Sequence, residues 1–108
     1  MPPSNTIEQY EKLTNQYLDD PKVVVGQMFG KPCVKVKGKA FLAQHKEAIV
    51  FKLSGTAHEK AMSHKGAVLW DPSGKGRPMK EWVALPVTAK GSFKTLAAAA
   101  YDYVANAV

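Results

Sequence analysis

Cysteine and long apolar runs are almost absent from this 108-residue chain. The single thiol, Cys33, excludes a disulfide within the chain and offers no set of thiolates for a structural zinc site. The longest apolar run, LAAAAY at residues 96–101, is far shorter than the ~20 residues of a membrane-spanning helix. The opening MPPSNTIEQYEK lacks the basic and apolar regions of a secretory signal. These absences predict a reducing, cytoplasmic setting without membrane association.

Acidic residues are scarce, with nine Asp and Glu against 15 Lys and Arg, for a net charge of +6. The excess lies in residues 31–80, where eleven basic residues face three acidic ones, while residues 1–30 are slightly acidic and residues 81–108 are neutral. A positive electrostatic potential around this central segment favours an anionic partner such as nucleic acid. The alternative is that the lysines only solvate the outer face of a sheet.

The length and the 45% apolar content are typical of one folded domain, which we assign to residues 1–108. Apolar residues at helical spacing predict a first helix in SNTIEQYEKLTNQYLDD, capped by Ser4 or Asn5. A short helix, GTAHEKAMSH, is expected after Ser54, and a third in SFKTLAAAAYDYVANAV. The apolar positions of the first helix are Ile7, Tyr10, Leu13, Tyr17 and Leu18.

Alternating and β-branched segments between these helices predict strands. KVVVGQMFG is expected to form the first strand and to close at a turn of Gly30, Lys31 and Pro32. CVKVKGKAFLAQ is expected to form a hairpin whose two-residue turn, Gly38 and Lys39, sets residue 36 opposite 41 and residue 34 opposite 43. AIVFKL, AVLW and EWVALP supply the remaining strands.

The order of elements, α-β(3-4)-α-β(2)-α, predicts an α+β fold of two layers. Its mostly antiparallel sheet is covered on one face by helices, and the other face is partly solvated and carries lysines.

Several short motifs then occur in a fixed order along the chain: MFG at 28–30, Pro32, VKGKAF at 36–41, FKL at 51–53, RPMKEW at 77–82, and a helical tail with Ala100 and Tyr103. Together they resemble the TfoX N-terminal domain family, which is related in architecture to YjbR-like proteins. The likeness extends from about Gly26 to Val104. It implies an α+β domain with little chemistry: two-domain members are associated with competence regulation, and YjbR-like relatives have been proposed to bind DNA.

Residues for catalysis or metal binding are poorly placed. His58 and His64 are six residues apart on one predicted helix, so they cannot chelate a metal as an i, i+4 pair does, and His45 is expected in a loop. Cys33 near His45, or Ser54 with His58 and Asp71, lacks the flanking signature of a nucleophile. GQMFGK departs from a phosphate-binding loop. We therefore expect the protein to have no enzymatic activity and to bind no metal or cofactor.

The basic surface remains as the candidate site. Lys35, Lys37 and Lys52 are expected to share the solvent face of neighbouring strands, and Lys39 to cap a hairpin. The loop DPSGKGRPMKEW adds three more cations, whereas its Trp82 is expected to be a core anchor. The predicted nucleic-acid-binding residues are Lys35, Lys37, Lys39, Lys75, Arg77 and Lys80.

The most favoured function is a non-enzymatic regulatory or DNA-binding module that contacts phosphates. A second hypothesis is a protein-interaction domain that docks a partner or another copy of itself through its sheet face or an open edge strand. A third is a small-molecule binder with a pocket between the sheet and the C-terminal helix, where Ala97 to Ala100 leave room or pack closely.

Overall fold

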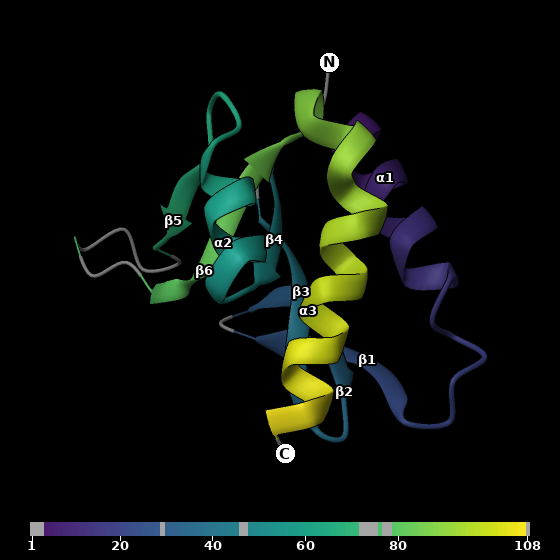
Figure 1. The fold of residues 1–108 in the computed structure, drawn as a ribbon. Helices are drawn as coiled ribbons and strands as arrows, with labels where there is room; N and C mark the ends of the chain where they lie inside the picture. Colours follow the sequence, from purple (N-terminus) through teal and green to yellow (C-terminus); the bar gives the residue numbers. More distant parts are fainter. Residues whose placement is uncertain (1–3, 29, 46–47, 72–75, 77–78, 108) are drawn as a thin grey trace.

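The computed structural model describes residues 4–28, 30–45, 48–71, 76 and 79–107. Within this part of the chain, three α-helices and a short 3-10 helix accompany a six-stranded antiparallel sheet, which confirms the predicted α+β fold (Figure 1). The elements, in chain order, are α1 Ser4–Asn15, β1 Val23–Met28, β2 Lys31–Val36, β3 Lys39–His45, β4 Ala48–Lys52, α2 Gly55–Met62, β5 Val68–Trp70, β6 Met79–Pro86, η1 Val87–Ser92 and α3 Phe93–Ala107.

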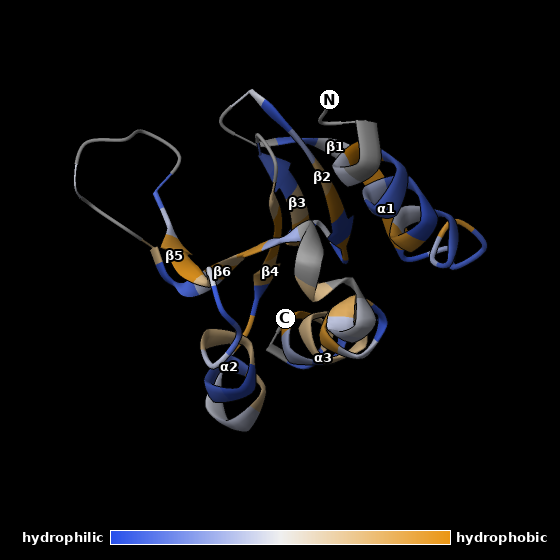
Figure 2. Cartoon of the chain, turned by 90° about the horizontal axis from the view of Figure 1, so that it is seen from above, coloured by the Kyte–Doolittle hydropathy of each residue, from blue (hydrophilic) through white to orange (hydrophobic). Residues whose placement is uncertain are grey.

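The helices form one layer and the sheet forms the other. Seen from above, α1, α2 and α3 all lie on the same side of the strands (Figure 2). The strand order is β1-β2-β3-β4-β6-β5, so β1 and β5 are the two edges. None of the helices in the described residues has the length and apolar character needed to span a membrane.

The main core fills the space between the two layers. The inner face of α3 is formed by Phe93, Leu96, Ala97, Ala100 and Val104, which recur at helical spacing and are all buried there. They meet the helix-facing side chains of the sheet, among them Val34, Phe41, Ile49, Phe51, Val83 and Leu85. This burial is what holds the helical layer on the sheet.

The hairpin of β2 and β3 differs from its predicted register. The turn is at Lys37 and Gly38, which both have positive φ (52° and 83°), and Val36 pairs with Lys39. Val34 pairs with Leu42 and Lys35 with Ala40, so Phe41 is an extra residue in a β-bulge. The bulge lets the consecutive residues Phe41 and Leu42 both enter the main core, which simple alternation does not allow.

Two other predictions about local structure are corrected. Lys31 and Pro32 belong to β2 rather than to a turn, and only Gly30 takes the left-handed conformation, with φ 75°. Pro32 is tolerated because the pairing of β2 with β3 stops at Cys33, so no amide is needed at Pro32. His45 is the last residue of β3 rather than part of a loop.

The apolar face of α1 is narrower than its sequence suggests. The helix ends at Asn15, and Ile7 and Leu18 are 45% and 51% exposed. Tyr10 and Leu13 are buried as predicted, and burial raises the pKa of the Tyr10 phenol to about 12.

A ring cluster joins the turn after α1, the bulge and α3. Tyr17 stacks on Tyr101 at 5.4 Å, and Phe41 meets both rings edge-on. The Tyr101 hydroxyl donates a hydrogen bond to the Asp20 carboxylate in the turn before β1. Chain segments 81 residues apart are thereby linked beside the start of the sheet.

Replacing Tyr101 by Phe removes this hydrogen bond but keeps the ring contacts. The bond is the main cause that lowers the pKa of Asp20 below its ordinary 3.8 and raises the pKa of Tyr101 above 10.0. It therefore stabilises the fold while Asp20 is ionised and Tyr101 is neutral. We expect the loss of unfolding free energy in Tyr101→Phe to be largest between about pH 4 and pH 10.

That loss should shrink as the pH falls through the lowered pKa of Asp20, and again as it rises through the raised pKa of Tyr101. Urea denaturation of both proteins at a series of pH values measures it. A difference that does not change with pH would contradict the assignment.

Candidate nucleic-acid interface

The face of the sheet that the helices leave uncovered is called here the open face. It carries a second, smaller apolar cluster, formed by Cys33, Ala43, Val50, Trp70, Trp82 and Ala84. The rings of Trp70 and Trp82 meet at 5.4 Å, and only 3% and 5% of their respective surfaces are exposed. Trp82 is thus a core anchor, as predicted, and neither ring is free to stack on a base.

Three lysines stand on the open face because of strand alternation. Lys31 and Lys35 lie two residues on either side of Cys33 in β2, and Lys52 lies two residues after Val50 in β4. Successive side chains of a strand point to opposite faces, so these lysines share the face of Cys33 and Val50. All three are half-buried, which fits aliphatic stems that lie along apolar surface while the ammonium groups reach water.

Lys35 has a particular place on this face. Its Cε and Nζ atoms lie 3.5 and 3.7 Å from where a Cβ on Gly26 would stand, in the neighbouring edge strand β1. Gly26 has no side chain, so the Lys35 stem can lie across β1 and carry its ammonium toward the sheet edge. The charge is therefore displaced from β2 toward the rim of the open face.

Acidic residues are gathered on the other side of the molecule. Of the eight that the structure describes, seven belong to the helices, to the turn after α1, or to a contact with α3: Glu8, Glu11, Asp19, Asp20, Glu59, Glu81 and Asp102. The eighth, Asp71, follows β5 and accepts a hydrogen bond from the Gly76 amide at 2.8 Å. The open face thus carries lysines with few carboxylates nearby, whereas on the helical side the seven carboxylates accompany further lysines, among them Lys12, Lys60 and Lys94.

The predicted binding residues that the structure describes are not brought together as expected. Lys35 is on the open face, but Lys37 is in the hairpin turn, and its Nζ donates to the carbonyl of Ala105 in α3 at 3.3 Å. Lys39 pairs with Val36, whose side chain enters the main core, so it also lies on the helical side. The prediction that Lys35 and Lys37 share one face is wrong. Lys37 has a left-handed conformation in the turn, so its side chain does not follow the alternation of the strand.

The remaining described candidate, Lys80, belongs to β6. Lys80 is exposed, and its carbonyl oxygen lies 2.7 Å from Nε2 of His58 in α2. Lys75 and Arg77 lie outside the described residues. Lys31 was missed because it was assigned to a turn, and Lys52 was placed on the solvent face but left out of the predicted set; counting in steps of two from Cys33 and Val50 would have found both.

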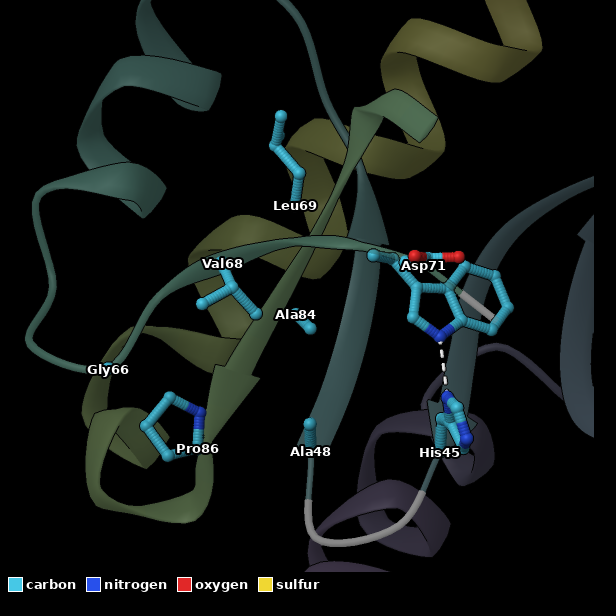
Figure 3. A pocket seen from close by; sticks show the side chains of 9 residues that line it. His45, Ala48, Gly66, Val68, Leu69, Asp71, Ala84 and Pro86 are labelled. Carbon is cyan, nitrogen blue, oxygen red and sulfur yellow. Dashed lines mark hydrogen bonds between the residues drawn. The ribbon is translucent and has the colours of Figure 1, made fainter. Parts of the chain in front are cut away.

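The histidines do not form a site. His45 accepts a hydrogen bond at Nδ1 from the Trp70 indole Nε1–H, at 2.7 Å, and its ring meets the Trp70 ring edge-on (Figure 3). Among residues 4–28, 30–45, 48–71, 76 and 79–107, no group of three or more His, Cys, Asp or Glu side chains is placed to hold a metal ion. Cys33 is fully buried, and burial raises the pKa of its thiol.

A shallow pocket of about 380 Å³ adjoins this histidine, between β5 and the ends of β3, β4 and β6 (Figure 3). Its walls are mainly apolar, and its polar side chains, His45 and Asp71, are already hydrogen-bonded to Trp70 and Gly76. Between the sheet and the C-terminal helix, where the third hypothesis requires a pocket, Ala97 and Ala100 are fully buried in the main core, which agrees with the alternative of close packing.

Comparison with known proteins gave no match, whether against protein families, curated sequences or solved structures.

Replacing His45 by Ala tests the contact that supports the open-face cluster. The buried Trp70 indole N–H would lose its acceptor, so we expect a loss of about 1–3 kcal/mol in the free energy of unfolding. His64→Ala removes a half-buried imidazole from the turn between α2 and β5 and should cost less than about 0.5 kcal/mol. Denaturation followed by tryptophan fluorescence measures both; equal losses would show that the Trp70 contact contributes nothing.

Proposed function

We propose that the protein is a non-enzymatic nucleic-acid-binding module whose open sheet face contacts the phosphate backbone through Lys31, Lys35 and Lys52. The observation that carries the proposal is the uneven distribution of acidic residues between the two layers. Three lysines stand on the strands of the open face, while seven of the eight described acidic residues belong to the helical side. A polyanion approaching the open face meets cations with few carboxylates to repel it.

The chemistry of this face favours positioning over sequence reading. Lysine ammonium groups bind phosphates as point charges, and the buried Trp70 and Trp82 cannot stack on bases. Binding is therefore of the electrostatic, sequence-independent kind, with dissociation constants in the range of about 10⁻⁴ to 10⁻⁶ M at physiological salt. The sequence-based candidates Lys75, Arg77 and Lys80 stay part of the proposed interface, and Lys80 belongs to β6.

The segments that resemble the TfoX N-terminal domain family support the same proposal. We also propose that the chain belongs to that family and has a regulatory role in the cytoplasm. The resemblance points away from catalysis.

The double variant Lys35→Ala/Lys52→Ala tests the open face directly. We expect wild type to bind a fluorescent DNA duplex and to lose about 40-fold in affinity from 50 to 200 mM salt if three phosphates are neutralised. The variant should bind more weakly at low salt, with a salt dependence lower by about two released ions. Fluorescence anisotropy at several salt concentrations gives both quantities.

The matched control is Lys12→Ala/Lys94→Ala, which removes the same charge from exposed positions on α1 and α3. It should leave the slope of affinity against salt unchanged. Equal weakening by both double variants would assign binding to net charge rather than to the open face, and no binding by wild type at low salt would remove the proposal.

A further inference from the structure

The strand β1 presents an unpaired edge. It pairs with β2 on one side only, and in the part of the chain that the structure describes no strand lies on its other side (Figure 1). The amide of Lys37 donates to the carbonyl of Lys22, so these two residues form a hydrogen-bonded pair next to β1 and β2. This pair determines which residues of β1 bond to β2. Because alternate residues bond to the neighbouring strand, Val25 and Gln27 direct their N–H and C=O groups outward.

This edge lacks the features that normally prevent pairing between molecules. Proteins blunt sheet edges with short strands, charged residues, proline or bulges. The other edge, β5, has three residues and an irregular register against β6. By contrast β1 has six residues, VVVGQM, with a regular register and neither charge nor proline.

Both faces of β1 also expose apolar side chains. Val24 on the open face is 54% exposed, and Val25 on the helical side is 57% exposed. A strand added to this edge would cover both valines and satisfy the outward backbone groups. The uncharged sequence specifies an uncharged, β-branched strand as the best partner, and β1 itself is such a strand.

We propose that two copies of this chain associate through β1, antiparallel, about a two-fold axis at Val25. In this register Val25 faces Val25 of the second copy as a hydrogen-bonded pair, and Val23 faces Gln27. On the open face, Val24 lies opposite Gly26 of the second copy. That glycine offers no side chain, but the methylenes of Lys35 lie across it and receive the valine.

Opposing charge does not prevent this arrangement. The two Lys35 stems rest on Gly26 positions that are diagonal neighbours, about 7–8 Å apart. Two unit charges at that distance in water repel by less than the thermal energy, and salt reduces this further. The surface buried by one strand pair is small, so a weak dimer that forms at high protein concentration is expected.

The dimer is independent of nucleic-acid binding and is tested without nucleic acid. Sedimentation equilibrium from about 10 µM to 1 mM should show wild type shifting from 11.8 kDa toward twice that mass. Val25→Lys places a charge on the edge and should remain monomeric over the same range, with unchanged thermal unfolding. The matched control is Val68→Lys, since Val68 is a 56% exposed valine on the other edge, and it should dimerise like wild type.

Cysteine substitution tests the register without relying on a disrupted interface. Val25→Cys would bring two thiols together across the axis, at a Cα separation of about 5.5 Å that a disulfide can span. Mild oxidation should link this variant into a covalent dimer, while Val24→Cys should link far less because it faces Gly26; the native Cys33 is buried.

A wild type that stays at 11.8 kDa at the highest concentration would overturn the proposal, as would a dimer that persists in Val25→Lys. Stronger cross-linking at residue 24 than at residue 25 would overturn the register. None of these results depends on whether the open face binds nucleic acid, so the two proposals fail separately.

Discussion

The alternation of side chains along β4 is the constraint on which the rest of the structure depends. Ile49 and Phe51 are fully buried against the helices, and Val50 is fully buried in the open-face cluster. The neighbouring β6 repeats the pattern, with Val83 on the helical side and Ala84 on the other. A slip of one residue would exchange the faces of a strand, so this one pairing fixes both apolar layers and the face on which Lys52 and its neighbours stand.

The open face has a structural role and also the proposed binding role, because its apolar cluster is small. Trp70 and Trp82 give it most of its buried area, and lysine stems border it instead of a second layer of helices. Charge on this face is therefore a structural consequence of leaving it uncovered as well as the basis of the proposed binding. The same reasoning applies to Gly26, where the missing side chain lets a neighbouring lysine cover backbone that would otherwise be bare.

Much of the fold could be predicted from the sequence, because helical and alternating periodicities are local and strong. The inner face of α3, the buried Trp82 and the order of elements all follow from such patterns. The bulge at Phe41 could not be predicted, since it depends on how two strands match at long range. Lys37 was misplaced for a related reason: a left-handed residue in a turn leaves the alternation that the strand on either side obeys.

The candidate site could also be predicted only in part. Which lysines share a face follows from counting along a strand, but the pairing of His45 with Trp70 joins residues 25 apart and has no signal in the sequence. The gathering of acidic residues on the helical side likewise follows only once the helices are placed on one side of the sheet, as Figure 2 shows for α1, α2 and α3.

The insertion of β6 between β4 and β5 has a consequence for synthesis of the chain. Strands β1 to β4 can assemble in the order in which they emerge, since each pairs with the next. The free side of β4 must then wait for β6, and β5 has no neighbour in the sheet except β6. The inner strand β4 is thus an open edge of the sheet during translation, and β5 cannot pair until β6 has been made.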